Sequence, residues 1–210
     1  MSPFDNINSR NKQKLLRLLK ADVYEYKAGK RILEMIYNDN IICVILEGQI
    51  EIIRTDYNGN KTVIEELEED DIFGNLISIL NNKENEIITK KETKILAIDY
   101  NTIINYEENS KGYYNEFIKN LFKMVVQKLN NANKRINIIT KKTIRNKLLA
   151  YFKITSKKSK SKIIYLPFNF SELADYLVVD RCAMSRELKN LKDDGLIEVE
   201  GKKIKLFYTV

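Results

Sequence analysis

The stretch NFSELADYLVVDRCAMSRELKNLKDDGLIEVEGKKIKLF (residues 169–207) decides the fold of the C-terminal part of the chain. Asn169 and Glu172 have the spacing of a capping box, in which each side chain accepts a hydrogen bond from the other residue's backbone amide. A short helix is therefore expected to begin after Asn169. A valine pair then forms a turn, and Asp180 can cap a second helix over residues 181–192. The pattern predicts a helix-turn-helix.

A β-hairpin is expected after the second helix. Gly195 suits the left-handed end of that helix, and apolar runs at residues 196–199 and 204–207 flank a turn that contains Gly201. Helix, turn, helix and hairpin in this order predict a winged helix. Seven side chains are expected on the outward face of the second helix and in the wing. They are Arg181, Cys182, Ser185, Arg186, Lys189, Lys202 and Lys203.

This layout suits the reading of duplex DNA. A helix fits the major groove, where the N-terminal residues of the helix reach the base edges. Arg181 and Arg186 can each hydrogen-bond guanine with a bidentate fork, which contributes about 1–3 kcal/mol of base discrimination. Lys189, Lys202 and Lys203 are expected to meet phosphates, which orients the protein without reading the sequence. The alternative is a small helical hairpin with ordinary surface arginines.

Charge is unevenly distributed along the chain. Residues 1–108 carry 14 Lys and Arg against 20 Asp and Glu, a net charge of −6, and residues 109–210 carry 22 against 9, a net charge of +13. The basic half favours contact with a polyanion and leaves a sensor or scaffold role to the other half. The alternative is a lysine-rich composition without functional meaning, but such a bias would spread lysine evenly.

Composition excludes several kinds of chemistry. The chain of 210 residues has no His, which excludes His-based metal sites, His-ligated haem and His-dependent catalytic triads. Cys43 and Cys182 alone cannot hold a four-cysteine iron–sulfur cluster or zinc site. We therefore expect no metal site and no enzyme activity. The longest strongly apolar run, residues 41–46, is too short to span a bilayer. We expect a soluble, cytoplasmic protein without a membrane partner.

Short β-type runs occupy the chain from about residue 23 to residue 100. The clearest are residues 41–46, 49–55, 62–67 and 94–98. Asn58-Gly59 predicts a hairpin because this dipeptide readily supplies positive φ. Several short strands at close spacing predict an antiparallel barrel or jelly roll.

A long helix is expected from about Tyr113 to Ile139, where apolar residues recur every three or four positions. Its apolar stripe can pack on its own domain or pair with the same stripe of a second copy as a coiled coil. Its place between an all-β half and a basic half favours the pair, and hence a homodimer. The residues expected at the dimer interface are Phe117, Leu121, Met124, Val125, Lys128, Leu129 and Ala132.

The whole chain resembles the Crp/Fnr superfamily of bacterial transcription regulators, the family of the catabolite activator protein. The specific part is FSELADYLVVDRCAMSRELKNLKDDGLIEV (residues 170–199), which looks like the family's helix-turn-helix and the start of its wing. Arg181 and Arg186 match the arginines of the recognition helix, whereas Cys182 stands where a base-contacting Glu often sits. That departure leaves the operator sequence open. Val178 occupies a turn position that is often Gly.

The N-terminal half resembles the cyclic-nucleotide-binding-type β-barrel of this family, a double-stranded β-helix. In cyclic-nucleotide binders a Gly-Glu pair holds the ribose, and an Arg followed by Ser or Thr holds the phosphate. The counterparts here are Gly74, Asn75 and Lys83, which form the candidate effector pocket. The lost carboxylate and Arg fork argue against cAMP and cGMP. The chain has no His, which argues against the family's haem branch. It also has no clustered Cys, which argues against the iron–sulfur branch. The effector stays open, with a merely solvated Lys83 as the alternative.

These observations predict an α+β protein in three parts. Residues 1–108 form an effector-sensing β-domain, residues 109–140 a dimerisation helix and hinge, and residues 141–210 a winged-helix DNA-binding domain. The expected function is that of a sequence-specific transcription regulator, a homodimer on a palindromic site in double-stranded DNA, with RNA polymerase as a further candidate partner. The alternative is a small-ligand-binding signalling module whose basic half docks RNA or a protein.

Overall fold

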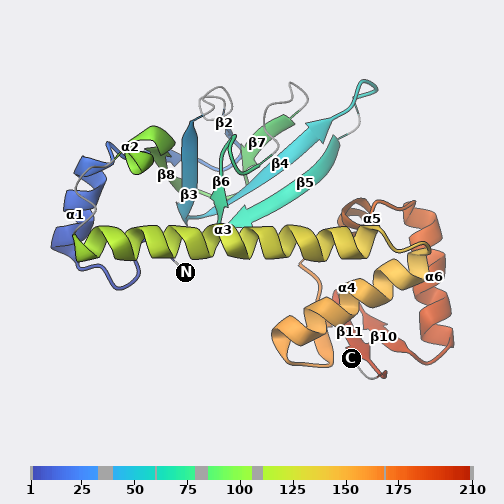
Figure 1. The fold of residues 1–210 in the computed structure, drawn as a ribbon. Coiled ribbons are helices and arrows are strands. Elements are labelled where there is room, and N and C mark those ends of the chain that lie inside the picture. The colour runs from blue at the N-terminus through green and yellow to red at the C-terminus, as the bar shows by residue number, and fades with distance from the viewer. Residues whose placement is uncertain are drawn as a thin grey trace. The chain divides into compact units, whose positions relative to one another are not determined.

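The computed structural model describes residues 2–32, 40–59, 61–78, 85–105, 111–167 and 169–208. The chain divides into two compact units, Met1–Leu129 and Asn130–Val210. The division falls inside one continuous helix, α3 (Gly112–Ile139), so that each unit contains part of it (Figure 1). Over these residues no helix combines the length and the apolar character that a bilayer span requires.

Two antiparallel four-stranded sheets form the N-terminal unit, in the orders β1-β8-β3-β6 and β2-β7-β4-β5 (Figure 1). Their strands are β1 (Asp22–Tyr26), β2 (Arg31–Ile32), β3 (Ile41–Glu47), β4 (Gln49–Thr55), β5 (Lys61–Glu68), β6 (Ile72–Phe73), β7 (Asn85–Thr89) and β8 (Thr93–Asp99). Cys43 and Ile45 of the first sheet share one buried cluster with Ile50 and Ile87 of the second. The predicted jelly roll is confirmed. Within the described residues its ladders form two sheets instead of a closed barrel.

The turn at Gly48 carries the chain from one sheet to the other. β3 ends at Glu47 in the first sheet, and β4 begins at Gln49 in the second. Gly48 has a φ of +98°, and a Cβ atom there would lie 2.3 Å from the Glu92 carbonyl oxygen. Only glycine fits so close a crossing. Residues 41–55 therefore form strands of two different sheets rather than one hairpin.

The hairpin that Asn58-Gly59 predicts is confirmed. β4 and β5 pair in antiparallel register, from Gln49 opposite Glu68 to Thr55 opposite Lys61. Gly59 turns with a φ of +82°, and its amide donates to the Asp56 carbonyl at 3.0 Å. Glycine supplies the positive φ that this turn needs.

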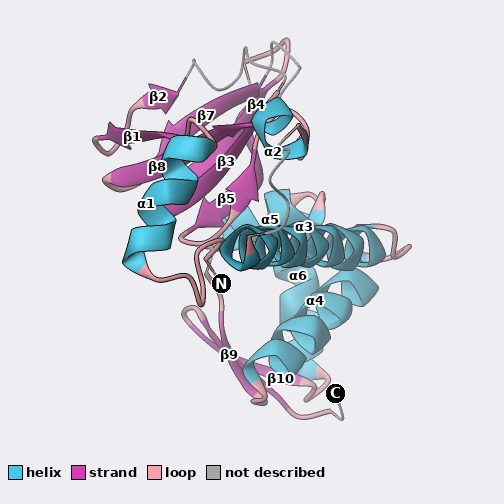
Figure 2. Ribbon diagram, turned by 60° about the vertical axis from the view of Figure 1, so that its left-hand side comes forward, coloured by secondary structure: helices cyan, strands magenta, loops and turns pink. Residues whose placement is uncertain are grey.

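Three helices cover the outer face of the first sheet: α1 (Ser9–Leu18), α2 (Tyr100–Ile104) and the first part of α3 (Figure 2). Leu15 of α1 and Ile103 of α2 share a buried cluster with Val44 of β3. β3 is thus buried on both faces, which explains its uninterrupted apolar run.

The buried side of α3 departs from the predicted dimer interface. Phe117, Leu121 and Met124 are buried in the N-terminal unit, in the cluster that includes the first sheet and α1. Lys128 Nζ lies 2.7 Å from Glu65 Oε1 on β5. Three of the predicted interface residues are thus buried within their own chain, and the fourth, the half-buried Lys128, pairs with β5. Their apolar period is the same as that of a seam, so periodicity could not separate the two.

The C-terminal unit has the predicted winged helix. Its elements are α4 (Ile144–Ser159), β9 (Ile163–Tyr165), α5 (Phe170–Leu177), α6 (Arg181–Asp193), β10 (Ile197–Glu200) and β11 (Lys203–Leu206). The strand order is β10-β11-β9, so β9 adds a third strand to the expected hairpin (Figure 2). A separate buried cluster from all three helices and the sheet, with Leu148, Leu173, Leu188 and Ile204 among its members, forms the core of this unit.

Candidate nucleic-acid interface

The helix α5 begins with the predicted capping box. The Asn169 side chain accepts from the amides of Ser171 and Glu172 at 2.9 and 3.0 Å. In return, Glu172 Oε2 accepts from the Asn169 amide at 2.7 Å. Leu173 and Ala174 on the inner side of α5 are buried. A small residue at this position lets two helices approach closely, as the helix-turn-helix requires.

A residue in an unusual conformation closes the turn between α5 and α6. Val178 ends α5 with a φ of +53° and a ψ of +62°, a left-handed conformation that β-branched residues rarely adopt. Lys147 of α4 donates to the carbonyls of Leu177 and Val178 at 3.0 and 3.2 Å. The Asp180 side chain caps α6 by accepting from the Ala183 amide at 2.8 Å. The predicted turn and the predicted caps are therefore present.

The helix α6 has one buried side and one exposed side. Met184, Leu188 and Leu191 are buried in the core of the C-terminal unit. The exposed residues on the other side are Arg181, Cys182, Ser185, Arg186 and Lys189, which we call the reading face. At 3.6 residues per turn these five positions lie within about 140° of the helix circumference. The structure thus brings together all five predicted residues of this helix.

The two arginines of the reading face are directed to solvent. Both Arg181 and Arg186 are exposed. Arg186 Nε donates to the Cys182 carbonyl of its own helix at 3.5 Å, which is a long contact. Arg186 can therefore exchange this weak hydrogen bond for one with a base edge at little cost in free energy.

The two predicted wing lysines lie at the turn between β10 and β11. Lys202 is exposed, and its Nζ lies 3.4 Å from the Pro167 carbonyl oxygen. Lys203 is half-buried, and its Nζ donates to Glu200 Oε2 at 3.0 Å. That hydrogen bond raises the pKa of Lys203 above its ordinary value. Lys202 is therefore the more accessible of the two to a phosphate.

Two of the three predicted effector-pocket residues lie directly after β6. Gly74 is buried with a φ of +129°, and a Cβ atom there would lie 2.3 Å from the Ile41 carbonyl oxygen. The Gly74 carbonyl accepts from the Ile77 amide at 2.9 Å, which makes a tight turn. Asn75 is half-buried in this turn. Lys83 lies outside the described residues. In the part of the chain that the structure describes, there is no group of three or more His, Cys, Asp or Glu side chains that could hold a metal ion.

A row of exposed apolar side chains runs along α3. Its members are Phe122, Val125, Leu129, Ala132 and Ile136, which we call the α3 stripe. They are spaced alternately three and four residues apart, the heptad pattern of a coiled coil. Three of them are among the residues predicted at the dimer interface. Phe122, which is 68% exposed, and Ile136 are not among them, and the strict heptad is the signal that adds both to the stripe.

Two protein-family models match the chain. The cyclic nucleotide-binding domain matches residues 23–109, which include both sheets of the N-terminal unit except Asp22, the first residue of β1. The Crp-like helix-turn-helix domain matches residues 146–207, which include the winged helix except the first two residues of α4. No curated protein sequence matches the chain.

Several solved structures share this fold at low sequence identity. A CooA mutant from Carboxydothermus hydrogenoformans is 19% identical, with a TM-score of 0.70 over 98% of this chain and 91% of that chain. The c-di-GMP responsive global regulator CLP of Xanthomonas campestris is 16% identical, with a TM-score of 0.63 over 95% of this chain and 100% of that chain. The catabolite activator protein of Thermus thermophilus is 17% identical, with a TM-score of 0.50 over 98% of this chain and 93% of that chain.

Proposed function

The chain belongs to the Crp/Fnr superfamily of DNA-binding transcription regulators, and from this premise we propose that it works as a homodimer that reads a palindromic site in duplex DNA. This family consists of transcription regulators and not of enzymes. The observation that carries the proposal is the reading face of α6, with two exposed arginines and an exposed lysine on one side of a capped helix.

The reading face is arranged for the major groove. The first turn of α6 carries Arg181 and Cys182, and Arg186 follows one turn later. A helix that enters the groove by its N-terminus presents these side chains to base edges. Lys189 and Lys202 would meet phosphates on either side of the bases. The arginines then determine the sequence that is read, and the lysines contribute affinity for any sequence.

The α3 stripe supports the proposed homodimer. Its heptad spacing over 15 residues, Phe122–Ile136, fits the a and d positions of a two-stranded coiled coil. A pair of α3 helices would relate two reading faces by a two-fold axis. The half-sites of the operator are then expected about one helical turn apart, roughly 10 bp from centre to centre, or a multiple of that spacing.

We expect no response to cAMP or cGMP, although the N-terminal unit has the cyclic-nucleotide-binding fold. Asn75 is an amide where a ribose-binding carboxylate would be needed. Equilibrium dialysis of the full chain with each nucleotide checks this expectation. Saturable binding at micromolar nucleotide would contradict it.

The place of action and one further partner follow from the proposed role. A bacterial regulator that reads chromosomal DNA acts in the cytoplasm. At a promoter, RNA polymerase is the protein partner that such a regulator is expected to meet.

Selection of bound duplexes from a random pool tests the proposed function. We expect enrichment of an inverted repeat. Affinity for that repeat should fall with salt, with a slope of about −0.9 per neutralised phosphate in a log–log plot. No enrichment, together with tight binding to single-stranded RNA, would contradict the proposal.

Two variants separate base reading from phosphate contact. Arg186→Ala should relax the sequence preference at one base pair of each half-site and cost roughly 1–3 kcal/mol on the preferred sequence. Lys202→Ala should weaken binding to all sequences by a similar factor and make the salt slope shallower by about 1. Equal losses on all duplexes for both variants would show that the assigned roles are wrong.

A further inference from the structure

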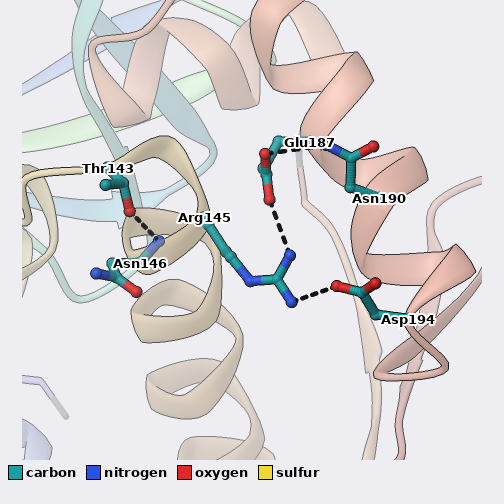
Figure 3. A network of polar contacts seen from close by, with 6 residues as sticks. All are labelled: Thr143, Arg145, Asn146, Glu187, Asn190 and Asp194. Carbon is teal, nitrogen blue, oxygen red and sulfur yellow. Dashed lines mark hydrogen bonds and ion pairs between the residues drawn. The ribbon is translucent and has the colours of Figure 1, made fainter.

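One side chain of α4 ties two turns of the recognition helix together. Arg145 Nη1 lies 3.2 Å from Glu187 Oε1, and Arg145 Nη2 lies 2.5 Å from Asp194 Oδ2. Figure 3 shows the guanidinium between the two carboxylates, with Asn190 on the far side of Glu187. Asn190 Nδ2 donates to Glu187 Oε2 at 3.3 Å, which fixes that carboxylate from the other side.

The carboxylates that Arg145 holds lie on a flank of α6, apart from the reading face. Glu187, Asn190 and Asp194 follow the i, i+3, i+7 spacing, so they form one row along the helix axis. The two ends of this row are about 10 Å apart at 1.5 Å per residue. A guanidinium that holds both ends restrains both the rotation and the tilt of α6. The apolar core beneath α6 is not directional in this way.

Arg145 also lies at the beginning of α4. The helix α3 ends at Ile139, and α4 begins at Ile144 after the cap residue Thr143. The Thr143 side chain accepts from the Asn146 amide at 3.1 Å (Figure 3). The first turn of α4 is therefore well defined, and Arg145 projects from it. This turn is the first part of the winged helix that follows α3 along the chain.

Arg145 stays protonated and positively charged. The hydrogen bond with Asp194, with a further contribution from Glu187, raises the pKa of the guanidinium above its ordinary value. Asp194 is the C-cap residue of α6, where a negative charge is unfavourable and a nearby cation is favourable for the helix. One arginine thus forms ion pairs with both carboxylates, in a geometry that a lysine, as a point charge, cannot reproduce.

We propose that Arg145 is a positioning residue for DNA reading, which fixes the direction of α6 relative to α4 and so aims Arg181 and Arg186 at their bases. The inference rests on the proposed function, because a fixed direction of α6 matters only if its side chains read bases. Arg145 touches no base itself in this role. It raises the preference for the right sequence and leaves general affinity for DNA unchanged.

A distance measurement without DNA tests the positioning directly. Cys182 is an exposed free thiol at the start of α6, and Cys43 is buried, so a Lys153→Cys variant would carry spin labels on α4 and α6 only. Labelled protein is diluted into excess unlabelled protein, so that each dimer has at most one labelled protomer. We expect one narrow distance distribution with Arg145 present and a broader or shifted one after Arg145→Gln. An unchanged distribution would overturn the proposal.

DNA binding by unlabelled full-length protein gives the second readout. Arg145→Gln should lower the ratio of specific to non-specific affinity at least about fivefold, the lower end of what one misaligned arginine fork costs. Its salt slope on random duplex should not change. The double variant Glu187→Gln/Asp194→Asn should lose selectivity in the same way, and Arg145→Lys should recover it only in part. Lys119→Gln, which removes one charge from an ion pair with Glu116 on α3, is the matched control and should bind as the unaltered protein does.

Other outcomes identify other roles. If Arg145→Gln makes the salt slope on random duplex shallower by about 0.9 with the ratio unchanged, Arg145 contacts a phosphate and the proposal is wrong. If the double variant binds every duplex more tightly with the ratio unchanged, Arg145 only screens two carboxylates, which also overturns it. If Arg145→Gln does not fold, Arg145→Lys and the double variant decide. If the unaltered protein shows no selectivity, the proposed function fails, while the distance measurement still decides whether Arg145 orients α6.

Discussion

Val178 shows how a single residue can hold backbone strain at the centre of the helix-turn-helix. Its left-handed φ of +53° is costly for a β-branched side chain, by about 1–2 kcal/mol relative to the right-handed region. The side chain is 63% exposed, so it recovers little of this cost by burial. The carbonyl of Val178, however, accepts from Lys147 of α4. The turn is kept in place by its surroundings and not by the preference of valine.

Val178→Gly should therefore stabilise the protein. Glycine adopts the same φ without strain, and relief of that strain exceeds the extra entropy of glycine in the unfolded chain. We expect a gain of roughly 0.5–1 kcal/mol in the free energy of unfolding, measured by urea denaturation. Lys153→Gly, at an exposed position inside α4, is the control and should lose about 1 kcal/mol. A loss of stability at both positions would show that Val178 is not strained.

The two cysteines differ in environment and should differ in reactivity. Cys43 lies between the two sheets and is fully buried, which raises the pKa of its thiol well above the ordinary value. Cys182 is exposed on the reading face. Cys43 lies in the apolar run of residues 41–46, and its burial fits that position.

A thiol reagent should modify Cys182 within minutes in the folded protein and reach Cys43 only after unfolding. Mass spectrometry should find one adduct per chain under native conditions and two in denaturant. Because Cys182 lies on the reading face, the native adduct should weaken binding to the operator. Two adducts under native conditions would contradict the burial of Cys43.

Asp71 is a carboxyl group that folding makes less acidic. Burial raises its pKa above the value of 3.8 in a free chain, although Asp71 accepts from the Glu68 amide at 2.9 Å, which acts in the opposite direction. A raised pKa in the folded state favours folding below pH 3.8, and this advantage is lost as the pH rises through the raised value. At neutral pH the ionised group is therefore a net cost.

Asp71→Asn should remove that cost, since the amide oxygen can still accept from Glu68. The free energy of unfolding should rise at pH 7 relative to the unaltered protein, and this difference should disappear as the pH falls below about 4, where a free carboxyl becomes protonated. Urea unfolding at several pH values measures the difference. A variant that is less stable at pH 7 would show that the charge of Asp71 helps the fold, for example through nearby Lys128.

Single residues also mark where sequence reasoning stops. The cap residues Asn169 and Asp180 could be predicted because their function needs only local spacing. The pairing of Lys203 with Glu200 could not, since side chains of a hairpin turn can adopt several rotamers. The ion pairs of Arg145 could not be predicted either, because its two partners are 42 and 49 residues away along the chain.

At the scale of elements, α3 has two apolar sides with different roles. One side, with Phe117 and Met124, is buried in the N-terminal unit. The other is the α3 stripe, which is exposed within one protomer. The prediction from the sequence placed residues of both sides in one interface, because the apolar residues of both sides recur with a helical period.

A charge in the α3 stripe should separate the protomers. Leu129 is 58% exposed in the protomer, so Leu129→Asp should disturb the fold little. It would place two carboxylates face to face in a coiled coil, and we expect a change from dimer to monomer in sedimentation at micromolar concentration. Gln127→Asp, at an exposed α3 position outside the stripe, is the control and should stay dimeric. A Leu129→Asp dimer would exclude this stripe as the interface.

Element boundaries in the C-terminal unit were harder to predict than the elements themselves. The basic run SKKSKSK (residues 156–162) has the polar composition of a loop, but α4 continues through Ser159 and ends where Lys160 has a φ of +51°. Lysine is compatible with a helix, so composition alone does not end one. The Ser156 hydroxyl donates to the Ser161 carbonyl at 2.6 Å, a contact from the last turn of α4 to the residue after its C-cap that no periodicity reveals.

At the scale of the molecule, the two units have separate cores. The buried residues of the C-terminal unit form one cluster, and those of the N-terminal unit form two others. The sequence could predict this division into a β-rich and a helical part from the change in period and charge. It could not decide between a closed barrel and a jelly roll of two sheets, because this depends on the crossing at Gly48 and on contacts between distant strands.

Separate cores should unfold in separate steps. Differential scanning calorimetry of the full chain should show two transitions, and the selected operator duplex should raise the temperature of only one of them. Duplex at 100 times its dissociation constant stabilises the binding unit by about 2.7 kcal/mol. A single transition that moves as a whole would show that the two units unfold together.

The third strand of the wing has a mechanical consequence. β9 follows directly after α4 and is fastened to the hairpin at both ends, with the Leu166 amide 2.9 Å from the Lys202 carbonyl and the Leu206 amide 2.9 Å from the Lys162 carbonyl. The wing is therefore expected to move together with α4. A rotation of α4 would turn the hairpin and α6 as one body, so a conformational change that reaches α4 would be sufficient to withdraw both from DNA.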